Sequence, residues 1–464
     1  MRPTSSRTGC LAVGGLLAVG LAANLGLHLL EPRLAVTWSY AHLWRYRALG
    51  WLAVGVVLAV PPTVAAVWRG PALAEPLRPV AAWQVAVATL ALFSAFAYAG
   101  LRHPSHPTTI DPPLYVIAIS RGEVNARHLL TTWSLGRLAA LLRPWIAPAS
   151  LILVMSAVYG TITQLALVAS ARRLARTRSD ALAIAVLSCT AFGVVQMCFG
   201  VANSRSVALA MLSVFCWTAL RVVDGAGSAL WPFLIGIVGI FWYNGLVLLA
   251  PSLVVLAAEL LRRPGGRSEL ARAVATSVLA AGLATVPTYG AAFAWAPFLR
   301  DAHAASSCEL GVSPTSCLLP PGYVFTTRHA LEVLHVWLLI DGVGILLLAV
   351  AGTWLLIRLV RERTWDPKAA LLAPIVAGVF AFSLTMDNLF GNYANWDVFS
   401  YGAAASGLLG SYAFVAWGRE CPSVFRVLLG VALAAAVVHL LARLNAMHIA
   451  LSLHAAESPP PAGL

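Results

Sequence analysis

Hydrophobic runs of about 20 residues recur along the chain, and short polar segments rich in arginine separate them. An α-helix rises about 1.5 Å per residue, so such a run can cross a bilayer core about 30 Å thick. The pair 230–244 and 245–261 is short, and either two helices or one bent element fits it. We predict an all-α, polytopic integral membrane protein with about thirteen spans, over residues 10–30, 49–68, 80–100, 147–170, 180–199, 206–221, 230–244, 245–261, 273–297, 335–358, 369–387, 397–417 and 425–442.

Composition excludes a soluble helical protein. Of the 464 residues, 60% are hydrophobic and 11% are charged, and the mean hydropathy is +0.81. Soluble domains have about 45–50% apolar and about 25% charged residues. The net charge of +13 comes from arginines spread over many loops rather than gathered in one patch. This spread favours contact with the membrane surface over binding of nucleic acid.

Basic residues also predict the orientation. They concentrate in alternate connections, including 172–178, 262–272 and 358–368. The positive-inside rule then predicts a cytoplasmic N-terminus and an extracytoplasmic active face in the plasma membrane. Under this orientation Cys308 and Cys317 share the outer loop 298–334, where a disulfide between them can persist.

The outer loop 101–146 contains a patterned segment. Its opening, HPSHPTTIDPP, cannot be helical because of its prolines, and LYVIAIS after it predicts a short apolar helix or turn. The stretch ARHLLTTWSLGRLAALLRPW predicts an amphipathic helix in the interface, with Leu130, Trp133, Leu138 and Leu141 on its apolar face and Thr131 on its polar face. Two histidines in HPSHP are too few to indicate a metal site. No cofactor is therefore predicted, although a divalent metal stays open.

Two acids have competing interpretations. Asp111 either begins an Asx-type turn before Pro112 and Pro113 or acts chemically near the outer face. Asp341 either caps a span that begins at Gly342 or is an intramembrane functional acid.

The order of these pieces resembles the GT-C class of membrane glycosyltransferases. Members carry an acid in the first large outer loop, followed by re-entrant or interfacial helices. The matching text is IDPPLYVIAIS and then NARHLLTTWSLGRLAALL, followed by VANSRSVALAMLSVFCWTALR, FWYNGLVLLAPSLVVLAAELLRR and GNYANWDVFSYGAAASGLL. The resemblance covers about residues 80–417. Pro112 and Pro113 stand where many members have a second acid beside the first. In the second outer loop, an acid that is common in relatives is replaced by the segment Asn203, Ser204 and Arg205.

The resemblance implies a polyprenyl-phosphate-linked sugar as donor, a glycan or lipid as acceptor, and membrane lipids as partners. Asp111 is the expected base, and Glu123 is the candidate second acid. The residues expected around the phosphate are Arg127, His128 and Arg205. Further candidates for binding donor or acceptor, which could instead be interface aromatics or loop-closing residues, are Tyr243, Asn244, Asn392, Trp396 and Asp397.

The implied organisation is an N-terminal hairpin over 1–79, a GT-C-like core over 80–417, and a final helix with a disordered tail over 418–464. Three alternatives to a glycosyltransferase stay open. They are a transporter or lipid flippase, a glycan ligase that uses diphosphate-linked donors, and a non-catalytic assembly factor. A transporter would favour repeats and charges at the middle of the membrane. The polar residues here gather at the predicted outer face instead.

Overall fold

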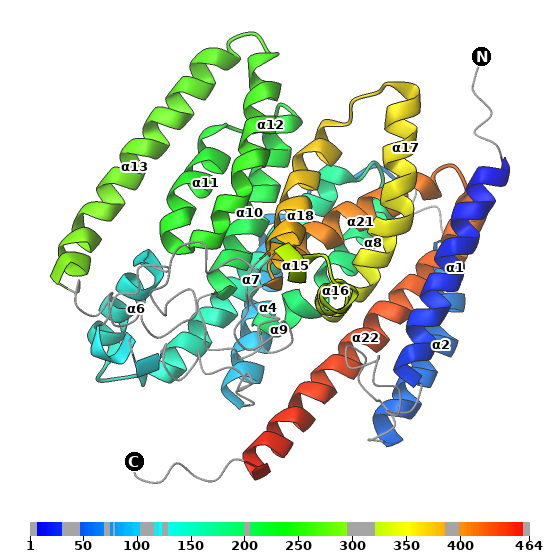
Figure 1. Ribbon diagram of the computed structural model, residues 1–464, viewed down its shortest axis with the longest axis horizontal. Coiled ribbons are helices and arrows are strands. Elements are labelled where there is room, and N and C mark those ends of the chain that lie inside the picture. The colour runs from blue at the N-terminus through cyan, green and yellow to red at the C-terminus, as the bar shows by residue number, and fades with distance from the viewer. Residues whose placement is uncertain are drawn as a thin grey trace.

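A computed structural model describes residues 7–29, 47–68, 75–77, 79–102, 116–117, 119–122, 129–198, 205–294, 321–385 and 399–457. All regular secondary structure in these ranges is helical, and the helices form a bundle (Figure 1). The first half contains α1 (Arg7–Leu29), α2 (Arg47–Val67), α4 (Ala82–Arg102), α6 (Leu129–Leu142), α7 (Pro148–Leu174), α8 (Arg178–Cys189), α9 (Phe192–Cys198) and α10 (Arg205–Val223). The second half contains α11 (Leu230–Trp242), η4 (Asn244–Leu249), α12 (Ala250–Leu261), α13 (Gly266–Ala294), α15 (Pro321–Val324), α16 (Thr327–Leu347), η6 (Leu348–Gly352), α17 (Thr353–Glu362), α18 (Pro367–Thr385), α21 (Gly402–Gly418) and α22 (Pro422–Glu457).

The predicted membrane character is confirmed. In the described part of the chain, eight helices are long and apolar enough to cross a membrane. The longest is the stretch Thr327–Glu362, which joins α16, η6 and α17. The other predicted runs also coincide with helices, but their apolar parts are shorter or, over 180–199, divided between α8 and α9. The chain is thus a multi-pass helical membrane protein, and the count of thirteen spans stays a prediction.

The short pair 230–244 and 245–261 forms two antiparallel helices rather than one bent element. The backbone of Tyr243 is extended, with φ −155° and ψ 116°, and this ends α11. The chain then reverses through η4 into α12. Gly236 consequently lies against Leu253, and Gly239 lies against Leu246. Tyr243 therefore sits at the tip of a helical hairpin.

The centre of the bundle is α21, whose residues are buried almost all round. A helix that is apolar on every side is expected inside a protein or a membrane. Its small residues allow close approach of neighbouring backbones. A Cβ added at Gly410 would lie 2.5 Å from the Gly344 carbonyl oxygen, so α21 and α16 touch through their backbones. Helices α7, α8, α10 and α18 also pack against this centre.

The two ends of the chain pack together at one side of the bundle. Helix α22 lies against both α1 and α2 (Figure 1). The segments 1–79 and 418–464, predicted as separate units, thus share one helical layer in their described parts. The tail 458–464, which we predict to be disordered, lies outside the described residues. On the opposite side, α13 covers α11 and α12.

The arginine-rich turns gather at one end of the bundle, which we call the basic end. It comprises the turns after α7, α10, α12, α17 and α21. Lys368 Nζ lies 2.9 Å from Asp224 Oδ1, and Arg419 Nη2 lies 2.7 Å from Asp180 Oδ2. Each of these ion pairs joins two different turns, so the turns lie at the same end of the bundle. Cys421, also at this end, is disulfide-bonded.

Candidate functional site

The structure describes three of the residues predicted to form the site, namely Arg205, Tyr243 and Asn244. The other predicted site residues lie outside the described ranges: Asp111, Glu123, Arg127, His128, Asn392, Trp396 and Asp397. The predicted disulfide partners Cys308 and Cys317 lie outside them as well. The three described residues come from two different elements, since Arg205 begins α10 and the other two follow α11.

Tyr243 packs against a tyrosine that the sequence analysis missed. Its ring meets Tyr401 edge to face, with centroids 5.8 Å apart and planes at 69°. Such a geometry is favourable for aromatic pairs. Gly245 fits between the two rings because it has no side chain. A Cβ there would overlap the Tyr243 ring and would lie 3.2 Å from the Tyr401 hydroxyl oxygen. The segment FWYNG thus holds Tyr243 against Tyr401 at the hairpin tip.

Tyr401 directly precedes α21 and is only 1% exposed. Among the described residues, no group forms a hydrogen bond with its hydroxyl. A buried polar group usually has a partner, because leaving it unpaired costs about 1–3 kcal/mol. An orphaned hydroxyl therefore indicates a place where a ligand could supply the missing bond. The signal in the sequence was an aromatic residue at the start of the small-residue run YGAAASG.

A positive charge acts on this hydroxyl. The charge of Arg205 acts on the Tyr401 hydroxyl, although more weakly than burial and the neighbouring Tyr243 do. Arg205 is also the first residue of α10, and a helix N-terminus carries unsatisfied N–H groups and about half a positive charge. We call Arg205, Tyr243, Asn244, Gly245 and Tyr401 the tyrosine site. Its charge and hydrogen-bond donors suit an anion such as a phosphate.

Helix α6 joins the tyrosine site through the hairpin tip. The Thr131 hydroxyl donates to the Trp242 carbonyl oxygen at 2.6 Å, which satisfies one of the carbonyls at the end of α11. Thr131 is fully buried, whereas Leu141 is exposed. The face that carries Thr131 thus packs on protein, and Leu141 lies on a face that the described residues leave uncovered. Thr131, Leu135 and Ala139 repeat at intervals of four residues and line the face that packs on protein.

Asp341 is a cap, as one of its two interpretations predicted. Its φ of −156° and ψ of 61° interrupt α16, and its Oδ1 accepts from the Gly344 N–H at 3.0 Å. This is the geometry of an N-cap. Its Oδ2 accepts from the Ser406 hydroxyl at 2.6 Å, which ties α16 to α21. Both carboxylate oxygens thus serve the fold.

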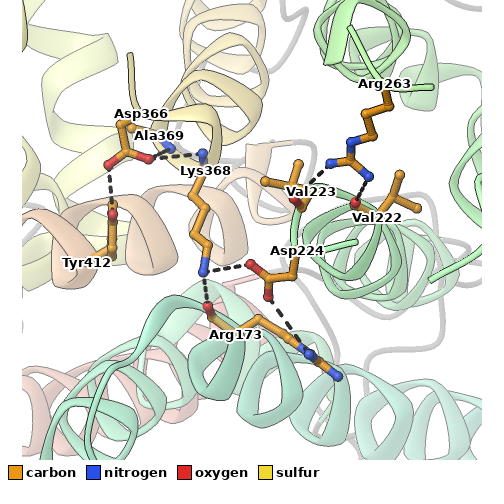
Figure 2. Close-up of polar contacts among 9 residues, drawn as sticks. All are labelled: Arg173, Val222, Val223, Asp224, Arg263, Asp366, Lys368, Ala369 and Tyr412. Atoms are coloured by element: carbon orange, nitrogen blue, oxygen red, sulfur yellow. Dashed lines mark hydrogen bonds and ion pairs between the residues drawn. The ribbon is translucent and has the colours of Figure 1, made fainter. Parts of the chain in front are cut away.

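The basic end holds a second polar cluster, which we call the charge network (Figure 2). Arg263 donates to the carbonyl oxygens of Val222 and Val223 at 2.6 and 2.8 Å, so it caps the end of α10. Asp366 accepts from the N–H groups of Lys368 and Ala369 at 3.0 and 3.1 Å, so it caps the start of α18. These groups hold helix ends together, and the charge network is structural rather than a ligand site.

The described residues contain no group of three or more histidine, cysteine, aspartate or glutamate side chains that could hold a metal ion. Comparison with protein-family models and with curated proteins finds no match to this chain. The tyrosine site is therefore the main basis for proposing a function.

Proposed function

We propose that this protein is a membrane glycosyltransferase that moves a sugar from a polyprenyl-phosphate donor to an extracytoplasmic acceptor. The orphaned hydroxyl of Tyr401, on which the charge of Arg205 acts, supports this most directly. Arg205 begins α10, and that helix ends at the charge network. The tyrosine site therefore lies at the end of the bundle away from the basic end, which is the predicted outer face.

The chemistry suits the groups present. The leaving group is a phosphate that is already ionised, so the site needs cations and hydrogen-bond donors more than a strong acid. Arg205 would neutralise the phosphate, and arginine can do so with two parallel hydrogen bonds. The Tyr401 hydroxyl would donate to a phosphate oxygen. Arg127 and His128, which directly precede α6 in the sequence, are proposed as further phosphate ligands.

The transfer step needs a base for the acceptor. In the proposal, Asp111 takes the proton from the acceptor hydroxyl while that oxygen bonds to the anomeric carbon. The bond between that carbon and the phosphate oxygen breaks, and its electron pair leaves with the polyprenyl phosphate. Glu123 is the second candidate acid. The residues proposed to hold donor or acceptor are Tyr243, Asn244, Asn392, Trp396 and Asp397.

The proposal prefers an enzyme to a transporter. Ionisable residues within spans often mark transport pathways. Asp341 is such a residue, but its carboxylate caps α16 and accepts from Ser406. The proposal also places thirteen spans in the plasma membrane, with a cytoplasmic N-terminus.

The deciding experiment compares two tyrosine variants in the purified full chain. Tyr401→Phe removes the orphaned hydroxyl, so folding should be unchanged or slightly favoured. Turnover of a polyprenyl-phosphate sugar should nevertheless fall at least about tenfold, the effect of losing about 1.4 kcal/mol in the transition state. Tyr412→Phe is the matched control. Its hydroxyl donates to Asp366 Oδ2 at 2.7 Å in the charge network, so its loss should lower stability and leave turnover intact.

The assay incubates wild-type protein and variants with a set of polyprenyl-phosphate sugars and follows donor consumption and thermal stabilisation. Asp111→Asn should be inert with normal folding. The proposal fails if no donor in the set is consumed or stabilises the protein. It also fails if Tyr401→Phe and Asp111→Asn both retain full turnover.

A further inference from the structure

A buried histidine near the start of α16 has one ring nitrogen without a donor. His329 is 1% exposed, and its Nε2 lies 2.8 Å from the Leu384 carbonyl oxygen at the end of α18. A carbonyl oxygen only accepts hydrogen bonds, so Nε2 carries a proton, and in a neutral ring Nδ1 is then an acceptor. Among the described residues, no group forms a hydrogen bond with Nδ1. The neutral ring thus buries an acceptor that lacks a donor, which is unfavourable.

The carboxylate of Glu332 faces the same nitrogen. Its Oε2 lies 3.7 Å from His329 Nδ1 and accepts a hydrogen bond from the Tyr323 hydroxyl at 3.1 Å. Its Oε1 accepts from Arg328 Nε at 3.2 Å. An ionised carboxylate has no proton to donate, so two acceptors face each other when the ring is neutral. One proton added at Nδ1 turns this contact into an ion pair.

The charges around His329 come from three helices. On α16, the Glu332 side chain is 30% exposed, whereas Arg328 is 81% exposed and is largely screened by solvent. On α15, the Tyr323 ring lies 5.2 Å from the imidazole. The last two turns of α18 contain no ionisable side chain, but the carbonyls at its end carry about half a negative charge. This offsets the half positive charge at the start of α16, so Glu332 is left to attract a proton to the ring.

The histidine fastens the end of α18 at the end of the bundle away from the basic end. The stretch Thr327–Glu362 runs through the bundle, and the turn that follows it lies at the basic end. One helical level deeper, Trp337 Nε1 donates to the Ser383 hydroxyl oxygen at 3.0 Å. Both hydrogen bonds join the last turns of α18 to α16. A bond donated by a charged imidazolium is stronger than one donated by a neutral ring.

We propose that His329 and Glu332 form a pH-dependent link, in which His329 takes up a proton at acidic pH, pairs with Glu332 and holds the end of α18 more firmly on α16. The folded chain binds this proton more tightly than the unfolded chain, because only folding places Glu332 beside the ring. The stability that the pair contributes is therefore present at acidic pH. It is lost as the pH rises through the range in which histidines ordinarily titrate, around pH 6.5. The link uses no residue of the tyrosine site and does not depend on the proposed glycosyl transfer.

The test is a double-mutant cycle with His329→Gln, Glu332→Gln and the double variant. Full-length protein in detergent is unfolded by denaturant at pH 5.5 and at pH 8.0. Between these values histidine ordinarily changes its charge and glutamate does not. We expect a coupling of about fivefold in the unfolding equilibrium constant at pH 5.5, the effect of a favourable, partly exposed ion pair, and a coupling close to one at pH 8.0.

Arg328→Met provides the matched control. Arg328 also pairs with Glu332, but arginine keeps its charge throughout this pH range, so the coupling between these two residues should be similar at both pH values. Hydrogen exchange gives a second measurement. After correction for the intrinsic effect of pH, the last turn of α18 should exchange about fivefold faster in Glu332→Gln than in wild type at pH 5.5, and equally at pH 8.0.

A coupling between His329 and Glu332 that is equal at the two pH values would overturn the proposal, because a purely structural contact does not depend on a proton. A larger coupling at pH 8.0 would overturn it as well. If His329→Gln does not fold, Glu332→Gln decides by itself, since it leaves the imidazole in place. Equal exchange of the last turn of α18 in wild type and Glu332→Gln at pH 5.5 would then refute the link.

Discussion

Replacing Lys368 with methionine tests how the basic end is held together. Lys368 Nζ lies 2.9 Å from Asp224 Oδ1 and also donates to the Arg173 carbonyl oxygen (Figure 2). Methionine keeps the apolar stem and removes the three donors. Asp224 is then left with Arg173, whose Nη1 lies 3.8 Å from Oδ2.

The expected cost follows from the burial of the pair. Both side chains are 24% exposed. Exposed ion pairs contribute about 0–1 kcal/mol, whereas breaking a buried pair costs about 3–5 kcal/mol. The Lys368–Asp224 pair lies between these cases, so we expect Lys368→Met to lower the free energy of unfolding by about 2 kcal/mol. Most of this should be coupling with Asp224.

The assay is a double-mutant cycle with Lys368→Met, Asp224→Asn and the double variant, each unfolded by denaturant in the same detergent. We expect a coupling free energy of about 1–2 kcal/mol, within the range for residues in contact. The control is Arg328→Met. It breaks the pair with Glu332, in which Arg328 is 81% exposed, and should cost under about 0.5 kcal/mol. Zero coupling, or an equal cost for the control, would refute the reasoning.

Three further predictions concern other parts of the bundle. Thr131→Val should cost about 1–2 kcal/mol and speed hydrogen exchange in α6, because the bond to the Trp242 carbonyl is lost, and Thr131→Ser should behave like wild type. Gly410→Leu should fail to give stable folded protein on size-exclusion chromatography, since the Gly344 carbonyl leaves no space; a stable monodisperse variant would contradict the backbone contact. Arg267→Cys at the basic end should react with an impermeant maleimide only after permeabilisation if this end is cytoplasmic, and labelling of intact cells would reverse the orientation.

Much of the fold could be predicted because the membrane constrains it strongly. Backbone groups in hydrocarbon must bond internally, so an apolar run of sufficient length becomes a helix. The start of α10 at Arg205 and the break at Tyr243 were also visible in the sequence, as polar residues at the ends of apolar runs. The cap by Asp341 was one of two interpretations that the sequence left open, because aspartate at the start of a helical segment can accept from its first N–H groups.

Part of the site could not be predicted, because it depends on contacts between distant segments. Thr131 looked like a polar-face residue, but it is buried by the end of α11, over a hundred residues away in the chain. Tyr401 became a candidate only when its hydroxyl proved to be buried without a hydrogen-bond partner among the described residues. Periodicity shows which face of a helix is apolar, and it does not show what covers that face.

The sequence by itself determined that this is a helical membrane protein, where most of its helices lie, and that its arginines gather in alternate turns. Length and hydropathy suffice for this, because they act locally along the chain. The tertiary structure alone decided which helices pair, that α1 and α2 meet α22, and that the turns form a charge network. It also decided that the buried Tyr401 hydroxyl has no hydrogen-bond partner among the described residues and that its ring meets Tyr243. These features depend on packing between segments that the chain separates.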